Sequence, residues 1–361
     1  MTMRIVQLLP TLSYGDAVSN DAITLGGVIS GMGFDTAIYA EIIDKRLPAG
    51  TARKAEKLAG LDKSDIIIYH KSTGTDLDKK LGDFPCRKIM IYHNITPPEF
   101  FRPYNPEAAA LTARGYEGLR RLKSTVDMCL AVSEYNKADL IRYGFTCPIE
   151  VRPILIPFAD YDKEPDSGTL ARYSDGKTNI LFVGRIAPNK KQEDVIRAFF
   201  RYRELDPSAR LILAGSWAGF ENYADRLKNY AKALGIADSV VFTGKCSFAD
   251  ILAYYRTASV FLCMSEHEGF CVPLVEAMYF DVPVAARDTS AISGTLGSSG
   301  MLLPDNDPVL AARVMQRIVS DSSLRQHIVS GQRRRLEDFS YDKIKALFEA
   351  QLKDFIDKGK I

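Results

Sequence analysis

The sequence predicts an α/β protein with two Rossmann-like, doubly wound domains, each built on a parallel sheet. Short apolar or β-branched runs alternate with amphipathic stretches along the whole chain of 361 residues. The runs are apolar throughout instead of at every second position, which is typical of strands covered by helices on both faces. The length suits two domains of about 100–200 residues each.

The strand-like runs fall into two groups, and each run is short and rich in Val, Ile, Leu or Phe. The first group lies in residues 4–9, 35–41, 65–70, 88–93 and 129–133. The second group lies in residues 179–184, 210–215, 239–244, 259–265 and 282–287. Because alternation with helices predicts parallel strands, we expect ligands to bind where the strands end, at their carboxyl ends.

Helical patterns and a change of composition divide the chain. Residues 17–32 and 105–124 have helical patterns, and residues 341–359 form one amphipathic helix with a single apolar stripe. Residues 157–178 are rich in Pro, Gly, Asp and Ser, which is typical of a linker. We therefore expect three segments: a first domain in 1–158, a linker in 159–178 and a second domain in 179–340.

The composition argues against several classes of protein. With 47 basic and 45 acidic residues and no aromatic stripe among the basic ones, the chain does not resemble a nucleic-acid-binding protein. The 6 cysteines lack metal-like spacing, which indicates free thiols in a reducing compartment. The N-terminus reads as a strand and not as a signal peptide, and no apolar run approaches the ~20 residues of a membrane span. We therefore expect a cytoplasmic protein.

A candidate anion site follows the first strand of the second group. In the segment FVGRIAPNKK, residues 182–191, Arg185 comes directly after the strand and Lys190 comes just before a helical pattern. Two cations and a helix N-terminus at the carboxyl end of a strand suit a pyrophosphate. Basic residues also flank many ordinary strand-to-helix turns, so this motif alone leaves a structural role open.

Two glutamates mark the segment SEHEGFCVPLVEAM, residues 265–278. Pro273 suits the first turn of a helix, and Gly269 lets the backbone approach a ligand closely. Glu268 can accept hydrogen bonds from sugar hydroxyls, and Glu276 can bind a vicinal diol such as a ribose. The structural alternatives are a solvated loop acid and a helix-surface glutamate. Four backbone amides are the expected donors to the ligand: those of Gly269, Phe270, Cys271 and Val272.

These segments resemble the donor half of the retaining GT-B glycosyltransferases of the large family 4. The resemblance runs in register over about residues 179–305 and includes the E-x7-E spacing of Glu268 and Glu276. It implies the GT-B fold, in which two Rossmann-like domains face each other across a cleft. It also implies that the C-terminal helix, 341–361, crosses back onto the first domain.

The resemblance assigns a role to each candidate residue. It implies that Arg185 and Lys190 hold the diphosphate of the donor. It implies that Glu268 and the backbone of residues 269–271 hold the sugar, and that Glu276 holds the ribose. In the first domain two positions match the family: Gly15, in a loop near the diphosphate, and His93, beside the transferred sugar. The alternative for His93 is a structural histidine at a strand end.

Other features leave alternatives open. The family often has Pro-Glu where this chain has Ser293 and Gly294, so the preference for sugar or base stays open. The D-x-D strings at 160–162 and 305–307 lie in the expected linker and in a turn, so we expect neither a metal nor a cofactor. The basic helix 113–124 either contacts the inner face of an anionic membrane or is a solvated surface.

We therefore expect a metal-independent, retaining hexosyltransferase. Its donor is a nucleoside diphosphate sugar, its acceptor is a saccharide or a lipid-linked saccharide, and its pathway makes cell-surface polysaccharide or glycoconjugate. No residue stands out as a carboxylate nucleophile, and the resemblance implies same-face attack by the acceptor. Two alternatives remain: a non-catalytic partner subunit that binds sugar nucleotides, and a sugar-nucleotide epimerase of the same architecture.

Overall fold

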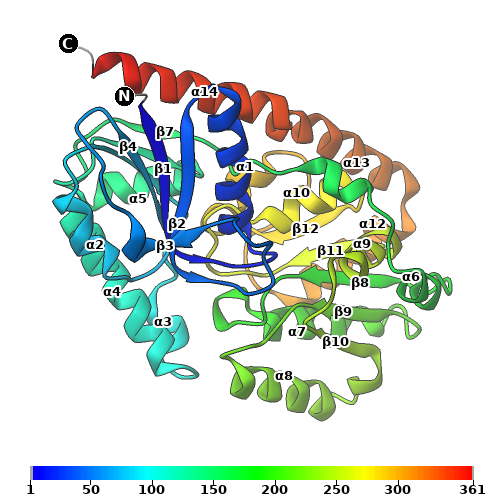
Figure 1. Ribbon diagram of the computed structural model, residues 1–361. Coiled ribbons are helices and arrows are strands. Elements are labelled where there is room, and N and C mark those ends of the chain that lie inside the picture. Colours follow the sequence, from blue (N-terminus) through cyan, green and yellow to red (C-terminus); the bar gives the residue numbers. More distant parts are fainter. Residues whose placement is uncertain (1–2, 360–361) are drawn as a thin grey trace. The chain divides into compact units, whose positions relative to one another are not determined.

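The computed structural model describes residues 3–359, which form two compact units (Figure 1). Unit 1 comprises Met1–Pro98, Glu107–Phe158 and Phe339–Ile361, and unit 2 comprises Glu99–Pro106 and Ala159–Asp338. Each unit contains one parallel sheet whose strands alternate with helices along the chain. Both units therefore have the doubly wound organisation that the alternating pattern predicts.

Unit 1 contains a seven-stranded sheet in the order β3-β2-β1-β4-β5-β6-β7. Its strands are β1 (Arg4–Leu12), β2 (Asp35–Ile43), β3 (Arg53–Lys54), β4 (Ile66–Lys71), β5 (Arg87–Tyr92), β6 (Met128–Ala131) and β7 (Ile149–Val151). Every residue of β4 is buried, which explains why its run is apolar without alternation. The chain builds outward from β1 to β3 and then returns to β4. The topological switch point therefore lies between β1 and β4.

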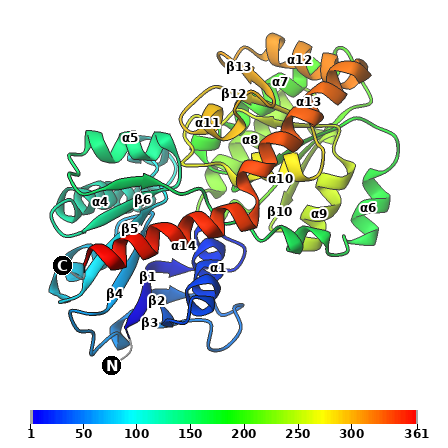
Figure 2. The ribbon, with the colours of Figure 1, turned by 90° about the horizontal axis from the view of Figure 1, so that it is seen from above.

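The helices of unit 1 cover this sheet. They are α1 (Ala17–Gly31), α2 (Leu77–Lys80), α4 (Pro106–Leu122), α5 (Glu134–Arg142) and α14 (Tyr341–Lys358). The Asp16 carboxylate caps α1 by accepting a hydrogen bond from the Ser19 amide. Helix α14 lies beside α1 (Figure 2) and buries Ile344, Phe348 and Leu352. The apolar stripe predicted from the sequence thus faces the core of unit 1.

Unit 2 contains a six-stranded sheet in the order β10-β9-β8-β11-β12-β13. Its strands are β8 (Asn179–Val183), β9 (Arg210–Ala214), β10 (Val240–Gly244), β11 (Val260–Cys263), β12 (Val284–Arg287) and β13 (Met301–Leu303). The switch point of this sheet lies between β8 and β11. Gly215, just after β9, has φ +155°, and a Cβ there would lie 2.0 Å from the Gly184 carbonyl oxygen, so only glycine fits.

The helices of unit 2 follow the same alternation. They are α6 (Ser167–Tyr173), α7 (Gln192–Arg203), α8 (Glu221–Ala233), α9 (Phe248–Thr257), α10 (Val272–Tyr279), α11 (Ile292–Leu296), α12 (Pro308–Ser320) and α13 (Ser322–Leu336). Two short 3-10 helices matter below: η3 (Phe158–Asp162) and η4 (Pro188–Lys190). No helix within residues 3–359 is both long and apolar enough to cross a membrane.

The predicted strands are all present, with ends that differ by a few residues. Three further strands, β3, β7 and β13, were not predicted. Each has only two or three residues and lies at or near a sheet edge. Runs this short leave no recognisable pattern in a sequence.

Residues 159–178 differ from the expected linker, because they are folded into unit 2. Tyr161 is buried, the Asp166 amide donates to the Ala249 carbonyl oxygen, and the Thr169 hydroxyl donates to Asp250. Glu99–Pro106, expected in the first domain, also clusters with unit 2. These contacts join residues far apart in the sequence, so a composition shift could not reveal them.

A buried ion pair in unit 1 gives a stability prediction. Arg152 Nη2 lies 2.6 Å from Asp21 Oδ2, and both side chains are fully buried. We expect Arg152→Met to lower the free energy of unfolding by about 3–5 kcal/mol, because Asp21 would keep a buried charge without its partner. Urea denaturation followed by circular dichroism measures the loss.

The matched control is Arg142→Met, since Arg142 is 71% exposed in its pair with Asp139. This change should cost less than about 1 kcal/mol. Equal losses in the two variants would contradict the importance of the buried pair.

Candidate functional site

Two predicted site residues of unit 2, Lys190 and Glu268, follow the strands on either side of its topological switch point. The chain leaves β8 and places Lys190 at the end of η4, and it leaves β11 and places Glu268 in the loop before α10. Strands β8 and β11 are neighbours in the sheet. In open parallel sheets this position, at the carboxyl ends of the two strands, is where ligands bind.

Lys190 and Glu268 form an ion pair at this position. The Lys190 Nζ donates to both carboxylate oxygens, at 2.6 Å each. The side chains are 22% and 8% exposed. Burial is the largest influence and works against the charged ammonium, but the neighbouring groups, led by the carboxylate of Glu268, together outweigh it, so the pKa of Lys190 is raised. Lys190 is therefore a fixed positive charge.

Polar side chains join the loops that surround this pair. The Asn189 side-chain nitrogen donates to the His267 carbonyl oxygen at 3.1 Å. The Glu268 amide donates to the Ser290 hydroxyl at 2.9 Å, which ties in the loop after β12. Asn189 Oδ1 is buried and has no hydrogen-bond partner among the described residues. Asn189 and Ser290 were not predicted, because single polar loop residues carry no sequence signal.

The segment after Glu268 enters α10 through a left-handed residue. Cys271 has φ +72°, and α10 begins at Val272 with Pro273 in its first turn, as predicted. Phe270 and Cys271 are buried, whereas Gly269 and Val272 are half-buried. The Thr295 hydroxyl donates to the Phe270 carbonyl oxygen at 2.5 Å. The backbone that was expected to donate to a ligand is thus held by a side chain of α11.

Glu276 is half-buried, and both of its carboxylate oxygens have a hydrogen-bond partner. The Tyr161 hydroxyl donates to Oε1 at 2.9 Å, and the Tyr255 hydroxyl donates to Oε2 at 2.7 Å. Burial raises the pKa of Glu276, and the two tyrosine hydrogen bonds offset only part of this rise. Two hydroxyl groups on two carboxylate oxygens reproduce the way a carboxylate binds a vicinal diol. Tyr161 comes from the segment expected as a linker and Tyr255 from α9, so neither contact could be predicted from the residue pattern.

Arg185 lies at the end of β8, as predicted, and its side chain is exposed. The guanidinium carbon lies 5.3 Å from the centre of the Phe220 ring and 5.7 Å from that of Phe101. The Arg185 carbonyl oxygen accepts a hydrogen bond from the Gln192 side chain at 3.1 Å. These contacts fix the start of the loop that carries Lys190.

Two metal-like groups of side chains occur among the described residues. The ligand atoms of Cys263, Glu268 and Cys271 lie within 4.8 Å of one another. In this group Lys190 already neutralises Glu268. The second group, Asp21, His70 and His93, is in unit 1.

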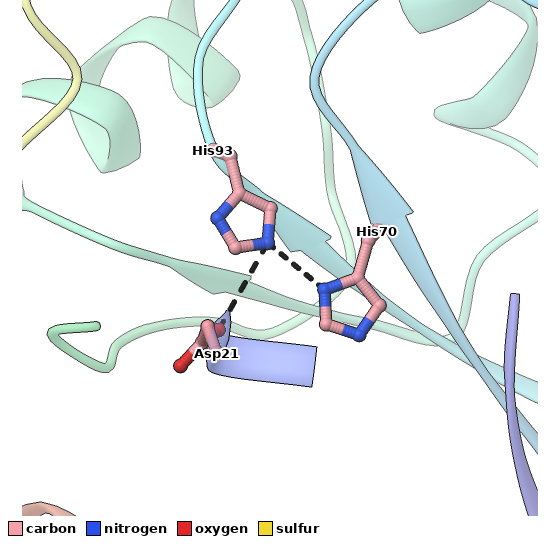
Figure 3. A group of neighbouring side chains, drawn as sticks. All are labelled: Asp21, His70 and His93. Carbon is pink, nitrogen blue, oxygen red and sulfur yellow. Dashed lines mark hydrogen bonds and ion pairs between the residues drawn. The ribbon is translucent and has the colours of Figure 1, made fainter. Parts of the chain in front are cut away.

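The two predicted residues of unit 1 also follow strands. Gly15 comes after β1 with φ +75°, and a Cβ there would meet nothing within 4 Å, so backbone conformation alone selects glycine. His93 comes directly after β5, and its side chain is 1% exposed. Figure 3 shows its Nε2 directed toward His70 Nδ1, at 2.9 Å, and Asp21 Oδ2, at 4.0 Å. Burial lowers the pKa of His93 to about 4, so the ring is neutral at pH 7.

Comparison with known protein sequences links unit 2 to glycosyl transfer. Residues 171–335 match the family model of glycosyl transferases group 1. A D-inositol 3-phosphate glycosyltransferase of Streptomyces bingchenggensis is 30% identical over 255 residues, which are 67% of this chain and 55% of that protein. The enzyme of the same name from Salinispora arenicola is 32% identical over 176 residues, which are 45% and 38% of the two chains. The chain thus spans about half or less of the curated relatives it matches.

Solved structures resemble almost the whole chain. A sucrose-phosphate synthase from Thermosynechococcus elongatus has a TM-score of 0.76 at 17% identity and covers 98% of this chain and 100% of its own. HepE from Anabaena, in complex with UDP-glucose, has a TM-score of 0.75 at 16% identity with the same coverage. These likenesses confirm the predicted fold class of two Rossmann-like domains. At 16–17% identity, these two structures show the fold alone.

The buried carboxyl of Glu276 gives a prediction on stability and pH. Its pKa is raised in the folded protein, so the protonated form stabilises the fold below the unfolded pKa, and this contribution is lost as the pH rises through the folded pKa. We expect Glu276→Gln to melt at a higher temperature than the parent at pH 8, with a gap that closes toward pH 5. In a domain of this size about 1 kcal/mol shifts the melting temperature by roughly 2–4 °C.

The matched control is Glu204→Gln, directly after α7, since the Glu204 side chain is 55% exposed. Its melting temperature should follow that of the parent at every pH. Differential scanning calorimetry measures these melting temperatures. A difference in melting temperature between Glu276→Gln and the parent that widens at acidic pH would contradict a raised pKa.

Proposed function

We propose that the protein is a retaining, metal-independent glycosyltransferase. It transfers a hexose from a nucleoside diphosphate sugar to a saccharide or lipid-linked saccharide in the synthesis of cell-surface polysaccharide or glycoconjugate. The observation that carries this proposal is the partly buried Lys190–Glu268 pair at the switch point of the unit 2 sheet. The pair puts a fixed cation and a hydrogen-bond-accepting carboxylate side by side where such sheets bind ligands.

Each part of the proposed donor binds to a different set of residues in unit 2. Lys190 and Arg185 bind the diphosphate, since both follow β8. Glu268 and the backbone of residues 269–272 bind the sugar. Glu276 binds the ribose, in place of the tyrosine hydroxyls that now occupy its two oxygens. HepE was solved with UDP-glucose, so UDP-glucose is the first donor to test.

In the proposed reaction the bond between the anomeric carbon and the diphosphate oxygen breaks. The acceptor hydroxyl forms the new bond on the same face of the sugar, and the departing diphosphate oxygen takes its proton. Lys190 stabilises the charge that develops on the leaving group, because its raised pKa keeps it protonated. In unit 1, the proposal assigns the loop of Gly15 to the diphosphate and the side chain of His93 to the sugar.

The acidic D-x-D strings support metal independence because their carboxylates have structural partners. Asp307 caps α12, and Asp305 accepts a hydrogen bond from the Asp307 amide at 2.9 Å. In the other string, Asp160 pairs with Lys163 and Asp162 accepts from the Tyr279 hydroxyl, both at 2.5 Å. Two cations at the diphosphate supply the charge that a divalent ion supplies elsewhere.

A lipid-linked acceptor would bring the protein to a membrane. Arg120, Arg121 and Lys123, at the end of α4 and just after it, are exposed. This basic cluster is the proposed surface for anionic lipid. Acceptors are therefore tested both in solution and in vesicles that contain phosphatidylglycerol.

The first experiment measures release of free nucleoside diphosphate from a panel of sugar nucleotides, starting with UDP-glucose. The acceptors are oligosaccharides, lipid-linked saccharides and D-inositol 3-phosphate, the substrate named in the curated relatives. We expect acceptor-dependent release that persists in EDTA, and a product that keeps the anomeric configuration of the donor in NMR spectra. Nucleotide binding without release would favour the non-catalytic subunit, and an epimerised sugar without acceptor would favour the epimerase.

Substitution of Lys190 gives a second prediction on activity. We expect Lys190→Ala to reduce kcat/KM at least 100-fold, because loss of a charged donor to the leaving group costs about 3 kcal/mol of transition-state stabilisation. Lys191→Ala is the control, since Lys191 pairs with Glu266 at 3.0 Å in the same loop. Similar losses of activity in both variants would argue against a specific role for Lys190.

A further inference from the structure

A buried network of polar side chains ends at His93 in unit 1. Gln7 comes from β1, His70 from β4, and Asp21 from α1, and all three are fully buried. His70 Nε2 lies 2.9 Å from Gln7 Oε1, and His70 Nδ1 lies 2.9 Å from His93 Nε2. The three residues Gln7, His70 and His93 therefore form one continuous chain of hydrogen bonds.

The orientation of the Gln7 amide sets the direction of this chain. Its Nε2 lies 2.8 Å from the Ala22 carbonyl oxygen in α1. A carbonyl oxygen can only accept, so the amide nitrogen must face it, and the amide oxygen must face His70. Gly26 leaves room for this arrangement, since a Cβ there would lie 3.3 Å from the Gln7 nitrogen.

The protons of both histidines follow from that orientation. Gln7 Oε1 accepts, so His70 carries its proton on Nε2, and as a neutral ring it has a bare Nδ1. That bare nitrogen accepts from His93 Nε2, so the proton of His93 is also on Nε2. The Asp21 carboxylate, 4.0 Å from the same nitrogen, favours a proton there as well. The Nδ1 of His93 is left with an unshared pair of electrons.

This Nδ1 atom has no hydrogen-bond partner within the part of the chain that the structure describes. In Figure 3 it lies on the side of the ring that faces away from His70. The side chain is 1% exposed, so Nδ1 is a buried acceptor without a partner among residues 3–359. A hydroxyl group is the matching donor.

We propose that Gln7 and His70 are positioning residues that hold His93 in its Nε2-protonated form, so that Nδ1 accepts a hydrogen bond from a hydroxyl group of the substrate. This inference rests on the proposed function, because a hexose supplies the hydroxyl. Asp21 and Arg152 support the same arrangement from the other side. Arg152 donates to both oxygens of Asp21, at 2.9 and 2.6 Å.

A metal ion bound by Asp21, His70 and His93 is the competing interpretation of this cluster. Such an ion would need the lone pairs of His70 Nδ1 and His93 Nε2 at once, whereas these two atoms share a proton at 2.9 Å. The guanidinium of Arg152 also places a positive charge beside Asp21. Both observations favour the hydrogen-bonded chain over a cation.

The test reads the protonation of His93 directly by NMR. The chain has 4 histidines, so protein labelled with ¹⁵N-histidine gives few ring signals in long-range ¹H–¹⁵N spectra. A His93→Asn variant assigns the His93 signals. We expect a protonated Nε2 and a bare Nδ1 at pH 7. A proton on His93 Nδ1, a doubly protonated ring, or loss of the Nε2 proton when Zn²⁺ is added would each overturn the inference.

Substitution of Gln7 tests its role as a positioning residue. Gln7→Met removes the acceptor of His70, which can then carry its proton on Nδ1 and donate to His93. We expect the His93 Nδ1 signal to move toward that of a protonated nitrogen. The matched control is Gln332→Met, which removes a buried glutamine bonded to Val282 and Val284 in unit 2 and should leave the His93 signals unchanged. If Gln7→Met does not fold, the spectrum of the parent protein still tests which nitrogen of His93 carries the proton.

Titration with UDP-glucose and with UDP connects the network to the substrate. In the parent protein, we expect UDP-glucose to shift the His93 Nδ1 signal and UDP to leave it unchanged. We expect Gln7→Met to bind UDP-glucose less tightly than the parent and to bind UDP with the same affinity. An Nδ1 signal that stays unchanged in the UDP-glucose complex would overturn the role as acceptor. The protonation measurement needs no turnover, so its result is separate from any failure of the proposed transferase activity.

Discussion

Buried charge needs a partner, and this requirement shapes the main ion pairs of both units. The strands are covered by helices, so the residues at their ends are withdrawn from water and cannot stay charged alone. Lys190 pairs with Glu268, Arg152 with Asp21, and Lys71 with Asp78, the last pair at 2.5 Å and at most 3% exposed. Such pairs contribute little net stability, but each fixes its side chains in one geometry. Fixed geometry is what a binding site requires.

The parallel sheet decides where these pairs gather. The carboxyl ends of neighbouring strands meet at one edge, and at a switch point the loops diverge and leave polar groups accessible. In unit 2 this edge receives Lys190 and Glu268 from the loops after β8 and β11. In unit 1 it receives the loop of Gly15 after β1, and His70 lies in the neighbouring β4. One rule of topology thus places the candidate residues of both units.

The sequence was sufficient to predict the longer strands and helices of each unit and to nominate candidate site residues. It was not sufficient to predict the partners of those candidates. Apolar runs predicted the longer strands, and an apolar stripe predicted α14. Strands such as β7 were missed because three residues carry no period. Tyr161 was assigned to a linker because the residues around it are polar, and its contact with Glu276 spans 115 positions. His70 and Gln7 look like interior strand residues, so only their hydrogen bonds show a role.

The polar groups that are proposed to bind substrate differ in whether they already have a hydrogen-bond partner. Glu268 and Glu276 already have donors, from Lys190 and from two tyrosines, so a sugar or ribose that binds there exchanges one hydrogen bond for another. An exchange contributes little free energy, although it selects ligands with the right geometry. His93 Nδ1 and Asn189 Oδ1 are buried acceptors without a partner among residues 3–359, so a donor there relieves a cost of about 1–3 kcal/mol each. Both atoms require an O–H or N–H group, and a sugar offers many hydroxyls. In the proposed complex, a donor at either of these unpaired acceptors therefore contributes more free energy than an exchange at a carboxylate, which contributes mainly selectivity.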